Sequence, residues 1–374
     1  MKTTKKQKKS NLKVSLLLLL LAAVLLISST YAWFVANTAV SVETIKVKIN
    51  TVEGLQISVD ASTWKSTVTN LDITSAGATY TNSVNQLPGR LKPCSTIGDI
   101  ENGNMKIFGQ TDESATYTGT DLDENGKALS GTSLLVADPL TDTRGTEGKY
   151  IAFDVFFNLQ SNESKKLFLT PQSQVTFDTA SAEADTNINP KTTKGLENAA
   201  RIAFIVEGYA QTADAATARE WKYEAANADC KFVLWEPNSN TGNHTQAAID
   251  NGTTSKPSDV PAYDPTKVTG ETAVNPLPYS GVKSAISAND KVYIYKATAG
   301  NFPAKFGAVT PTIWTDAGFT DNKDTTITLK PGITKMRIYM WIEGQDIDCW
   351  TGASGTYLNF DLQFKVDAAA QVSG

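Results

Sequence analysis

Apolar residues alternate with polar ones over long stretches of this 374-residue chain, and this period of two restricts the fold more than any other feature. The pattern is clearest near the C-terminal end. Met336, Ile338, Met340 and Ile342 alternate there with Lys335, Arg337, Tyr339 and Trp341, and the apolar residues from Leu358 to Val366 alternate with the polar ones from Tyr357 to Lys365. Such strands bury one face and expose the other, which predicts antiparallel sheets packed as a β-sandwich or jelly roll. Trp341 shares the polar face, so it lies either on a second buried face or in solvent.

Further strands follow the same pattern upstream. Ile45, Val47 and Ile49 form one apolar face, and Leu55, Ile57 and Val59 form a second after a turn or bulge at Glu53-Gly54. Residues 150–170 indicate a hairpin, with Tyr150 to Leu159 as one strand and Leu167 and Leu169 on the other. Arg201 to Glu207 and Thr325 to Leu329 complete the set, the latter followed by a turn at Pro331-Gly332.

The predicted organisation is a mainly β domain over residues 33–366 with long loop insertions and one short helix. The insertions, 111–148 and 237–290, are rich in Thr, Ser, Asn, Asp, Gly and Pro, and they read as surface loops with room for short strands. The helix is expected over Asp214 to Asn227, where an Asp can cap a run of good helix formers. Residues 367–374 are expected to be a flexible tail.

The first 36 residues predict export through a membrane. Residues 1–13 contain six lysines and no acidic residue, and the leucine-rich run that follows from Val14 leads to a Thr-Tyr-Ala triplet ending at Ala32. This order matches a secretory signal peptide cleaved between Ala32 and Trp33, the reading we favour. Alternatively, the apolar run continues to Ala36, and its 23 residues suffice to span a bilayer as an N-terminal hydrophobic helix.

Composition and charge limit both the class of protein and the kinds of molecule that it can bind. With 41% hydrophobic and 20% charged residues the chain resembles an ordinary globular protein, neither collagen-like, nor disordered throughout, nor polytopic. Removing residues 1–32 leaves 28 basic against 39 acidic residues, a net charge of −11, which makes nucleic acid a poor partner. The three cysteines, Cys94, Cys230 and Cys349, have no zinc-binding spacing, and either one pair with a free thiol or three separate thiols fits them.

The N-terminal residues resemble those of the TasA/camelysin group of exported Gram-positive proteins. The resemblance covers about residues 1–50: a lysine-rich start, a leucine run, Thr30-Tyr31-Ala32-Trp33-Phe34 and then a strand. It implies processing by a SipW-type signal peptidase, a jelly-roll domain, and biofilm-matrix fibres in which the N-terminal strand of one subunit completes the sheet of the next. Three other segments resemble uncharacterised surface proteins of intestinal Firmicutes, which imply no activity: Leu91–Ser95, Phe153–Phe157 and Trp341–Cys349.

Two acidic groups are candidate cation sites. Asp121, Asp123 and Asn125, followed by Gly126, match the first half of a calcium loop, but the twelfth position is Thr132 instead of Glu. The alternative there is an Asn-Gly hairpin turn. Glu343, Asp346 and Asp348 follow a strand end and can bind calcium or act as an acid/base pair, whereas the plainer interpretation is a solvated turn. We expect no cofactor other than such a calcium ion.

Catalytic motifs are lacking. The single histidine, His244, lies in a loop-like stretch, and neither GxSxG nor HExxH occurs, so we expect no enzyme activity. Seven tryptophans are compatible with sugar stacking, although burial in a sandwich core is the commoner case.

The sequence therefore predicts an extracellular or cell-surface β-sandwich with a structural or adhesive role. Self-association is expected through residues Thr38 to Asn50, whose Ile45, Val47 and Ile49 would leave their own sheet edge and pair with a neighbouring copy. The signal peptidase is a second expected partner, and the membrane a third if the N-terminus stays uncleaved. The competing hypothesis is a carbohydrate-binding module or glycosidase-like protein that uses its loops, Trp side chains and the Glu343 group.

Overall fold

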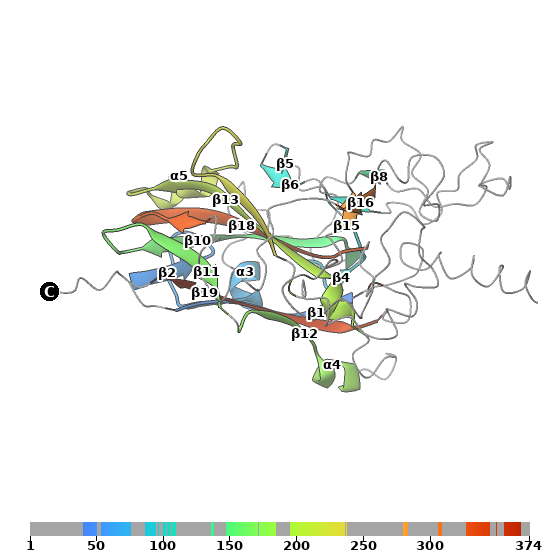
Figure 1. Cartoon of the computed structure of the whole chain (residues 1–374). Coiled ribbons are helices and arrows are strands. Elements are labelled where there is room, and N and C mark those ends of the chain that lie inside the picture. The colour runs from blue at the N-terminus through green and yellow to red at the C-terminus, as the bar shows by residue number, and fades with distance from the viewer. Residues whose placement is uncertain are drawn as a thin grey trace, which may run out of the picture.

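The protein, seen in a computed structural model, is a sandwich of two facing β-sheets (Figure 1). No helix among the described residues is long and apolar enough to cross a bilayer. The described residues are 40–50, 54–75, 87–94, 96, 100–101, 103–105, 107–109, 136–137, 147–170, 172–184, 195–235, 237, 280–282, 306–308, 327–344, 349 and 355–367.

The first layer, called sheet B here, has five antiparallel strands in the order β14-β13-β18-β10-β2. Its centre consists of three long strands with many β-branched and aromatic residues, which favour extended backbone. The strands are β14 (Lys231–Trp235), β13 (Ala200–Ala210), β18 (Gly332–Ile342), β10 (Tyr150–Leu159) and β2 (Leu55–Ser58).

The second layer, called sheet A, has eight strands, six of them in the order β17-β11-β19-β1-β4-β9. Its strands β1 and β19 run parallel, as do β4 and β9, so the sheet is not purely antiparallel. The period of two could not predict this, because it reports which face is buried and not the direction of the neighbour. The strands on this path are β17 (Thr328–Leu329), β11 (Lys165–Leu169), β19 (Tyr357–Val366), β1 (Val40–Ile49), β4 (Arg90–Leu91) and β9 (Glu147–Gly148); beside it, β12 (Gln174–Phe177) pairs with β19 and β3 (Thr67–Thr69) with β1.

Short elements fill the remaining described chain. One helix is expected, and the described residues contain three α-helices and one 3-10 helix: α3 (Asn70–Ser75), α4 (Thr179–Ala184), α5 (Ala215–Glu220) and η3 (Leu196–Ala199). The predicted helix begins as expected, because Asp214 accepts a hydrogen bond from Thr217 N, but it ends at Glu220. Small strands are β5 (Ile100–Glu101), β6 (Asn104–Met105), β7 (Phe108–Gly109), β8 (Val136–Ala137), β15 (Ser280–Val282) and β16 (Phe306–Ala308).

The main core lies between the two sheets, and the predicted alternation holds for the faces that build it. The apolar faces of β1, β13, β18 and β19 all point into this core. Leu358, Phe360, Leu362, Phe364 and Val366 are buried, whereas the residues between them are half-buried. Sheet A thus has one buried face and one partly exposed face, as the sequence predicts.

Sheet B differs, because both of its faces are buried. Lys335, Arg337, Tyr339 and Trp341 are at most 3% exposed, so the prediction of a wet face for this strand is wrong. Trp341 and Tyr339 belong to a second apolar cluster on the outer face, together with Cys94, Met105 and Ile107 from covering segments. Of the two alternatives for Trp341, the second buried face is therefore the one found.

The predicted hairpin over 150–170 is also wrong. Strand β10 pairs with β18 and β2 in sheet B, whereas β11 pairs with β17 and β19 in sheet A. The polar turn between them carries the chain from one layer to the other. Period and turn composition look the same for a hairpin and for such a crossing, since neither identifies the partner strand.

Candidate functional site

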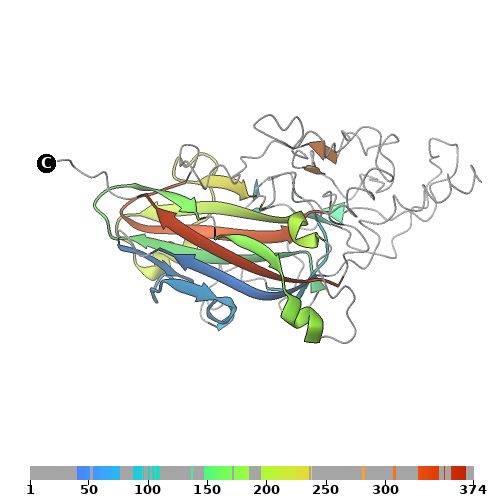
Figure 2. The ribbon, with the colours of Figure 1, turned by 60° about the horizontal axis from the view of Figure 1, so that its bottom comes forward.

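The first described strand, β1, lies inside sheet A with partners on both sides (Figure 2). On one side it runs parallel to β19, with eight paired positions from Ser41 opposite Tyr357 to Ile49 opposite Phe364. The register shifts between Val42 and Thr44, which places a β-bulge at Glu43. The strand-exchange hypothesis assumed that β1 lies at a sheet edge. Within its own chain β1 is instead an interior strand.

The other side of β1 has partners in separate pieces. Strand β4 pairs with Val40 and Ser41, and Val42 N donates to Gly89 O at 3.3 Å. Strand β3 pairs with β1 from Lys46 to Lys48. Between these pieces the side chain of Asn70 takes the place of a strand. Its Oδ1 accepts from Ile45 N and its Nδ2 donates to Glu43 O at 3.2 Å, so one amide group serves the backbone of the bulge.

The inward face of β1 fills part of the main core. Ile45, Val47 and Ile49, the residues predicted for strand exchange, are between 0 and 7% exposed and join Val40 in the core. Burial of an aliphatic side chain of this size contributes about 1.5–3 kcal/mol, so an empty β1 position would cost the sandwich a large part of its stability. The position must be filled, either by the chain's own β1 or by an equivalent strand.

A second feature of the molecule is a buried ion cluster on the outer face of sheet B. It is formed by Asp154, Glu207, Lys335 and Arg337. All four side chains are at most 3% exposed. Arg337 holds Asp154 at both oxygens, with Nε 2.7 Å from Oδ1 and Nη2 3.1 Å from Oδ2. Lys335 Nζ lies 2.8 Å from Glu207 Oε2 and 3.4 Å from Asp154 Oδ2, and Arg337 Nη1 lies 3.1 Å from Glu207 Oε1.

The two cations of this cluster also hold the segments that cover it. Lys335 Nζ donates to the carbonyl oxygens of Arg219 and Trp221, at 2.9 Å and 2.7 Å, where helix α5 ends. Arg337 Nη1 donates to Gly103 O and Asn104 Oδ1, both at 3.1 Å, in the β5–β6 turn. Sheet and covering layer are therefore joined through charged side chains as well as apolar ones.

Burial shifts the protonation of this cluster. Desolvation, helped by the charge of Asp154, raises the pKa of Glu207 to about 7, although Arg337 and Lys335 pull it down. The Glu207 oxygens form ion pairs with both cations, and these contacts offset only part of the effect of burial on its pKa. Both carboxylates are enclosed and engaged by cations, an arrangement typical of a structural ion network and not of an acid/base pair open to substrate.

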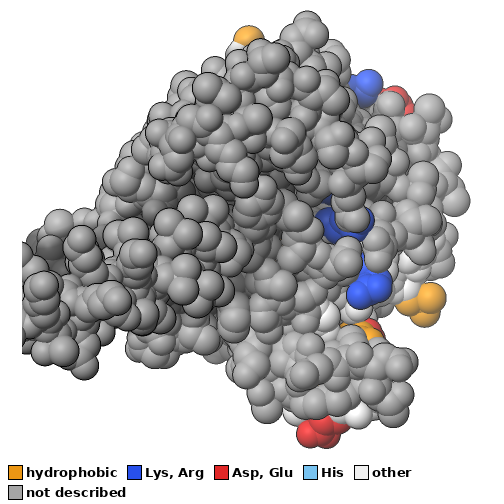
Figure 3. Space-filling view, turned by 90° about the vertical axis from the view of Figure 1, so that its right-hand side faces the viewer, with side chains coloured by type: hydrophobic (Ala, Val, Ile, Leu, Met, Phe, Trp, Pro, Cys, Tyr) orange, Lys and Arg blue, Asp and Glu red, His pale blue; other side chains and the backbone are white. Residues whose placement is uncertain are grey.

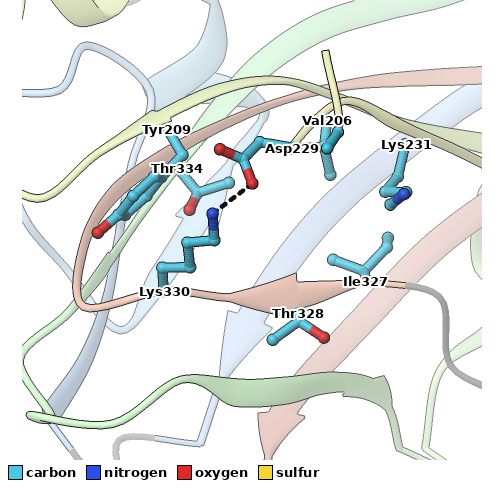
Figure 4. A pocket seen from close by; sticks show the side chains of 9 residues that line it. Val206, Tyr209, Asp229, Lys231, Ile327, Thr328, Lys330 and Thr334 are labelled. Carbon is cyan, nitrogen blue, oxygen red and sulfur yellow. Dashed lines mark hydrogen bonds and ion pairs between the residues drawn. The ribbon is translucent and has the colours of Figure 1, made fainter. Parts of the chain in front are cut away.

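A pocket of about 200 Å³ opens where the edges of the two sheets meet, between β13 and β17 (Figure 4). Asp229 and Lys330 point toward each other across it and form an ion pair, and Lys330 Nζ also lies 5.2 Å from the ring centre of Tyr209. Tyr209 Oη donates to Pro331 O at 2.7 Å. Because these polar groups engage each other, the pocket does not indicate a particular ligand.

Of the predicted acidic ligands, Glu343 alone lies within the described residues. Glu343 is fully buried, its Oε2 accepts from Trp341 Nε1 at 3.2 Å, and Cys94 forms a bridge with its backbone, so it does not lie in the solvated turn expected there. Asp346 and Asp348 lie outside the described residues, as do Asp121, Asp123 and Asn125 of the calcium hypothesis. Among the residues that are described, no three carboxylate, thiol or imidazole groups come together to hold a metal ion.

Some of the other predicted site residues lie outside the described part of the chain, and others are buried or half-buried. Ala32, Trp33 and His244 lie outside the described part of the chain. The three cysteines are buried and none of them is in a disulfide, which favours separate thiols over one pair with a single thiol left over. Trp235 and Trp341 are core residues, and Trp64 and Trp221 are half-buried against a small apolar cluster. In the view of Figure 3, the described side chains at the surface are scattered basic, acidic and apolar groups.

Sequence reasoning missed both Asn70 and the ion cluster. Lys335 and Arg337 looked like ordinary residues of a wet face. The signal available was Asp154, a carboxylate in the middle of a largely apolar strand, since such a charge needs a buried cation. Nothing in the sequence around Asn70 distinguishes it from a turn residue.

Comparisons of this chain with protein-family models, with curated proteins and with solved structures find no match.

Proposed function

We propose that this protein is exported and serves as a structural or adhesive protein of the cell surface or extracellular matrix, where copies assemble by exchanging strand β1. The observation that supports this most is the place of β1. It follows closely on the signal-like N-terminus, yet it fills an interior position of sheet A through backbone pairing on both sides. A second copy's β1 carries the same backbone and the same apolar face, so it can fill the same position.

Connectivity favours exchange of this strand over any other described strand. If cleavage follows Ala32, only residues 33–39 precede β1, and it can leave and re-enter a sheet without threading a loop. Its partner β19 lies more than 300 residues away in sequence. Such a distant parallel pairing forms late, because the chain between must be ordered first, and this leaves time for a neighbour's strand to compete.

Gly54, directly before β2, has a φ of +70°, a backbone conformation that glycine adopts without strain. A change of backbone angles at Gly54 would redirect β1 toward a neighbour while β2 remains in sheet B.

The proposed location is extracellular in either form of the N-terminus. Cleavage by a signal peptidase between Ala32 and Trp33 would release the subunit for assembly, whereas an uncleaved chain would remain on the membrane through residues 14–36. The role is structural, with no catalytic step. The sugar-binding alternative gains no support from the described tryptophans, which are buried or half-buried, and a glycan array with the mature protein would test it directly.

Deletion of residues 38–50 from the mature protein, residues 33–374, tests the proposal. The intact mature form is expected to assemble into polymers in sedimentation and electron microscopy. The deleted form is expected to remain unassembled, and a synthetic peptide of residues 38–50 should bind it and raise its melting temperature, since the peptide refills the β1 position. Unchanged polymers from the deleted form would exclude strand exchange.

A further inference from the structure

We propose that residues 66–75, comprising β3 and α3 and called the clip here, form a movable clasp that controls release of β1, with Asn70 as its latch. The inference rests on the proposed strand exchange for its biological consequence. The clasp itself rests only on contacts within one subunit, and it is testable without assembly.

The clip makes most of the backbone contacts on one side of β1. Three β1 residues, from Lys46 to Lys48, pair with β3, and Ile49 N donates to Ser66 O at 3.0 Å. Asn70 adds two contacts at the bulge, accepting from Ile45 N and donating to Glu43 O. From Glu43 to Ile49, the described contacts on this side of β1 all come from the clip.

The clip is held less firmly than the strand that it covers. It pairs with β1 at three positions, whereas β19 pairs with β1 at eight. Its apolar anchors are Val68 and Ile73, which are fully buried in the main core, while Leu71 on the same short helix is 73% exposed. A segment with two core anchors and a six-residue helix loses less on opening than β1, which places four residues in the same core.

The clip also has its own internal lock, which lets it move as one unit. Asp72 accepts hydrogen bonds from Thr69 N at 2.9 Å and Thr69 Oγ1 at 3.0 Å, both within the clip, and these two bonds tie β3 to α3 without involving β1. Asp72 also pairs with Lys65 Nζ just outside the clip, and the backbone of Lys65 is hydrogen-bonded to Ile57 of β2. Asn70 and the backbone of Ser66 and β3 supply the hydrogen-bonded contacts described between this unit and β1, so loss of the Asn70 contacts weakens the clasp without dissolving it.

Opening of the clip has two consequences for β1. The backbone groups from Glu43 to Ile49 on that side become available, and β1 stays attached through β19 and the short pairing with β4. A strand held mainly on one side can separate at much lower cost than one held on both. The clip therefore sets the rate at which a subunit gives up its own β1.

Hydrogen–deuterium exchange of the monomeric mature protein measures this directly. In Asn70→Ala, amides of residues 43–49 are expected to exchange about tenfold faster, because two hydrogen bonds to this stretch are lost, while β10 and β18 keep their protection. Asn70→Asp keeps the acceptor for Ile45 N and should give a smaller increase. Leu71→Gln, on the exposed side of the same helix, is the matched control and should leave β1 protection unchanged.

A cross-link tests the same clasp in the opposite direction. Lys46 and Thr69 are directly paired, so Lys46→Cys with Thr69→Cys offers a disulfide between β1 and the clip. Oxidation should slow β1 exchange and any polymerisation, and reduction should restore both. The double-cysteine variant also tests the clasp if Asn70→Ala fails to fold.

The outcomes separate the clasp from the function. Unchanged β1 exchange in folded Asn70→Ala, or unchanged exchange after cross-linking, overturns the clasp even if deletion of residues 38–50 abolishes polymers. Faster β1 exchange in Asn70→Ala without any polymer from any variant supports the clasp and overturns strand exchange.

Discussion

The two sheets use similar charged residues in opposite surroundings. On sheet A, Lys48 and Asp361 form a cross-strand ion pair at 3.0 Å, with side chains 40% and 29% exposed. On sheet B, Lys335 and Arg337 face Asp154 and Glu207 with almost no exposure. An exposed pair of this kind contributes at most about 1 kcal/mol, whereas a buried charge that loses its partner costs several times more.

This difference divides the sandwich into a fixed layer and an exchangeable one. Sheet B carries a covering layer that is bound through apolar contacts and through both buried cations. Sheet A has a wet outer face and an interior strand whose second side is held by short segments. We infer that sheet B supplies a rigid frame, against which β1 of sheet A can be exchanged.

The largest expected effect comes from breaking the ion cluster. Arg337→Met removes the cation that holds Asp154 at both oxygens and leaves Lys335 as the cation in contact with both buried carboxylates. We expect the free energy of unfolding to fall by about 3–5 kcal/mol in denaturant titration. Lys48→Met, the same kind of change on sheet A, should cost about 1 kcal/mol or less. Equal losses in the two variants would remove the distinction between the sheets.

The second effect is a pH dependence that belongs to sheet B. The pKa of Glu207 is raised to about 7 from an ordinary value near 4.5, chiefly by burial, so the folded state binds a proton that the unfolded state releases between these values. The stabilising contribution is complete below about pH 4.5 and is lost as the pH rises through about 7, up to about 3 kcal/mol. Wild-type stability should therefore decrease from pH 5 to pH 8 relative to Glu207→Gln, which carries no titrating group there. A constant difference between the two proteins over this range would contradict the assignment.

The sequence predicts which strand faces line the main core much better than it predicts which strands pair. Alternation identified the buried faces of β1, β13, β18 and β19, because burial on one face leaves a period of two. Alternation gave the wrong exposure where a second layer covers a strand, as at Lys335 and Arg337. Charged residues in a buried ion pair produce the same sequence pattern as charged residues on an exposed face. Alternation failed again at residues 150–170, because strand pairing is decided by packing far away in sequence.

The candidate site shows the same limit. Ile45, Val47 and Ile49 were identified as an apolar strand face, which is a local property. The interior place of β1, its parallel pairing with β19 and the role of Asn70 all depend on residues at least 25 positions away. Such contacts are set by tertiary structure, and no local pattern in one sequence encodes them.

The smallest expected effect concerns the fit of the covering layer on sheet B. A Cβ at Gly208 would lie 2.8 Å from Trp221 Cβ and Cγ, so the backbone of β13 and the segment after α5 approach too closely for any side chain there. Gly208→Ala should push this segment outward, lengthen the Lys335 contact to Trp221 O and destabilise the protein by about 1–3 kcal/mol. Gly89→Ala, beside β4 of sheet A, is the matched control, because a Cβ there meets nothing within 4 Å, and its stability should change by about 0.5 kcal/mol or less. Thermal unfolding with Trp fluorescence would record both variants, and a Gly208→Ala protein as stable as Gly89→Ala would show that the covering layer of sheet B adjusts freely.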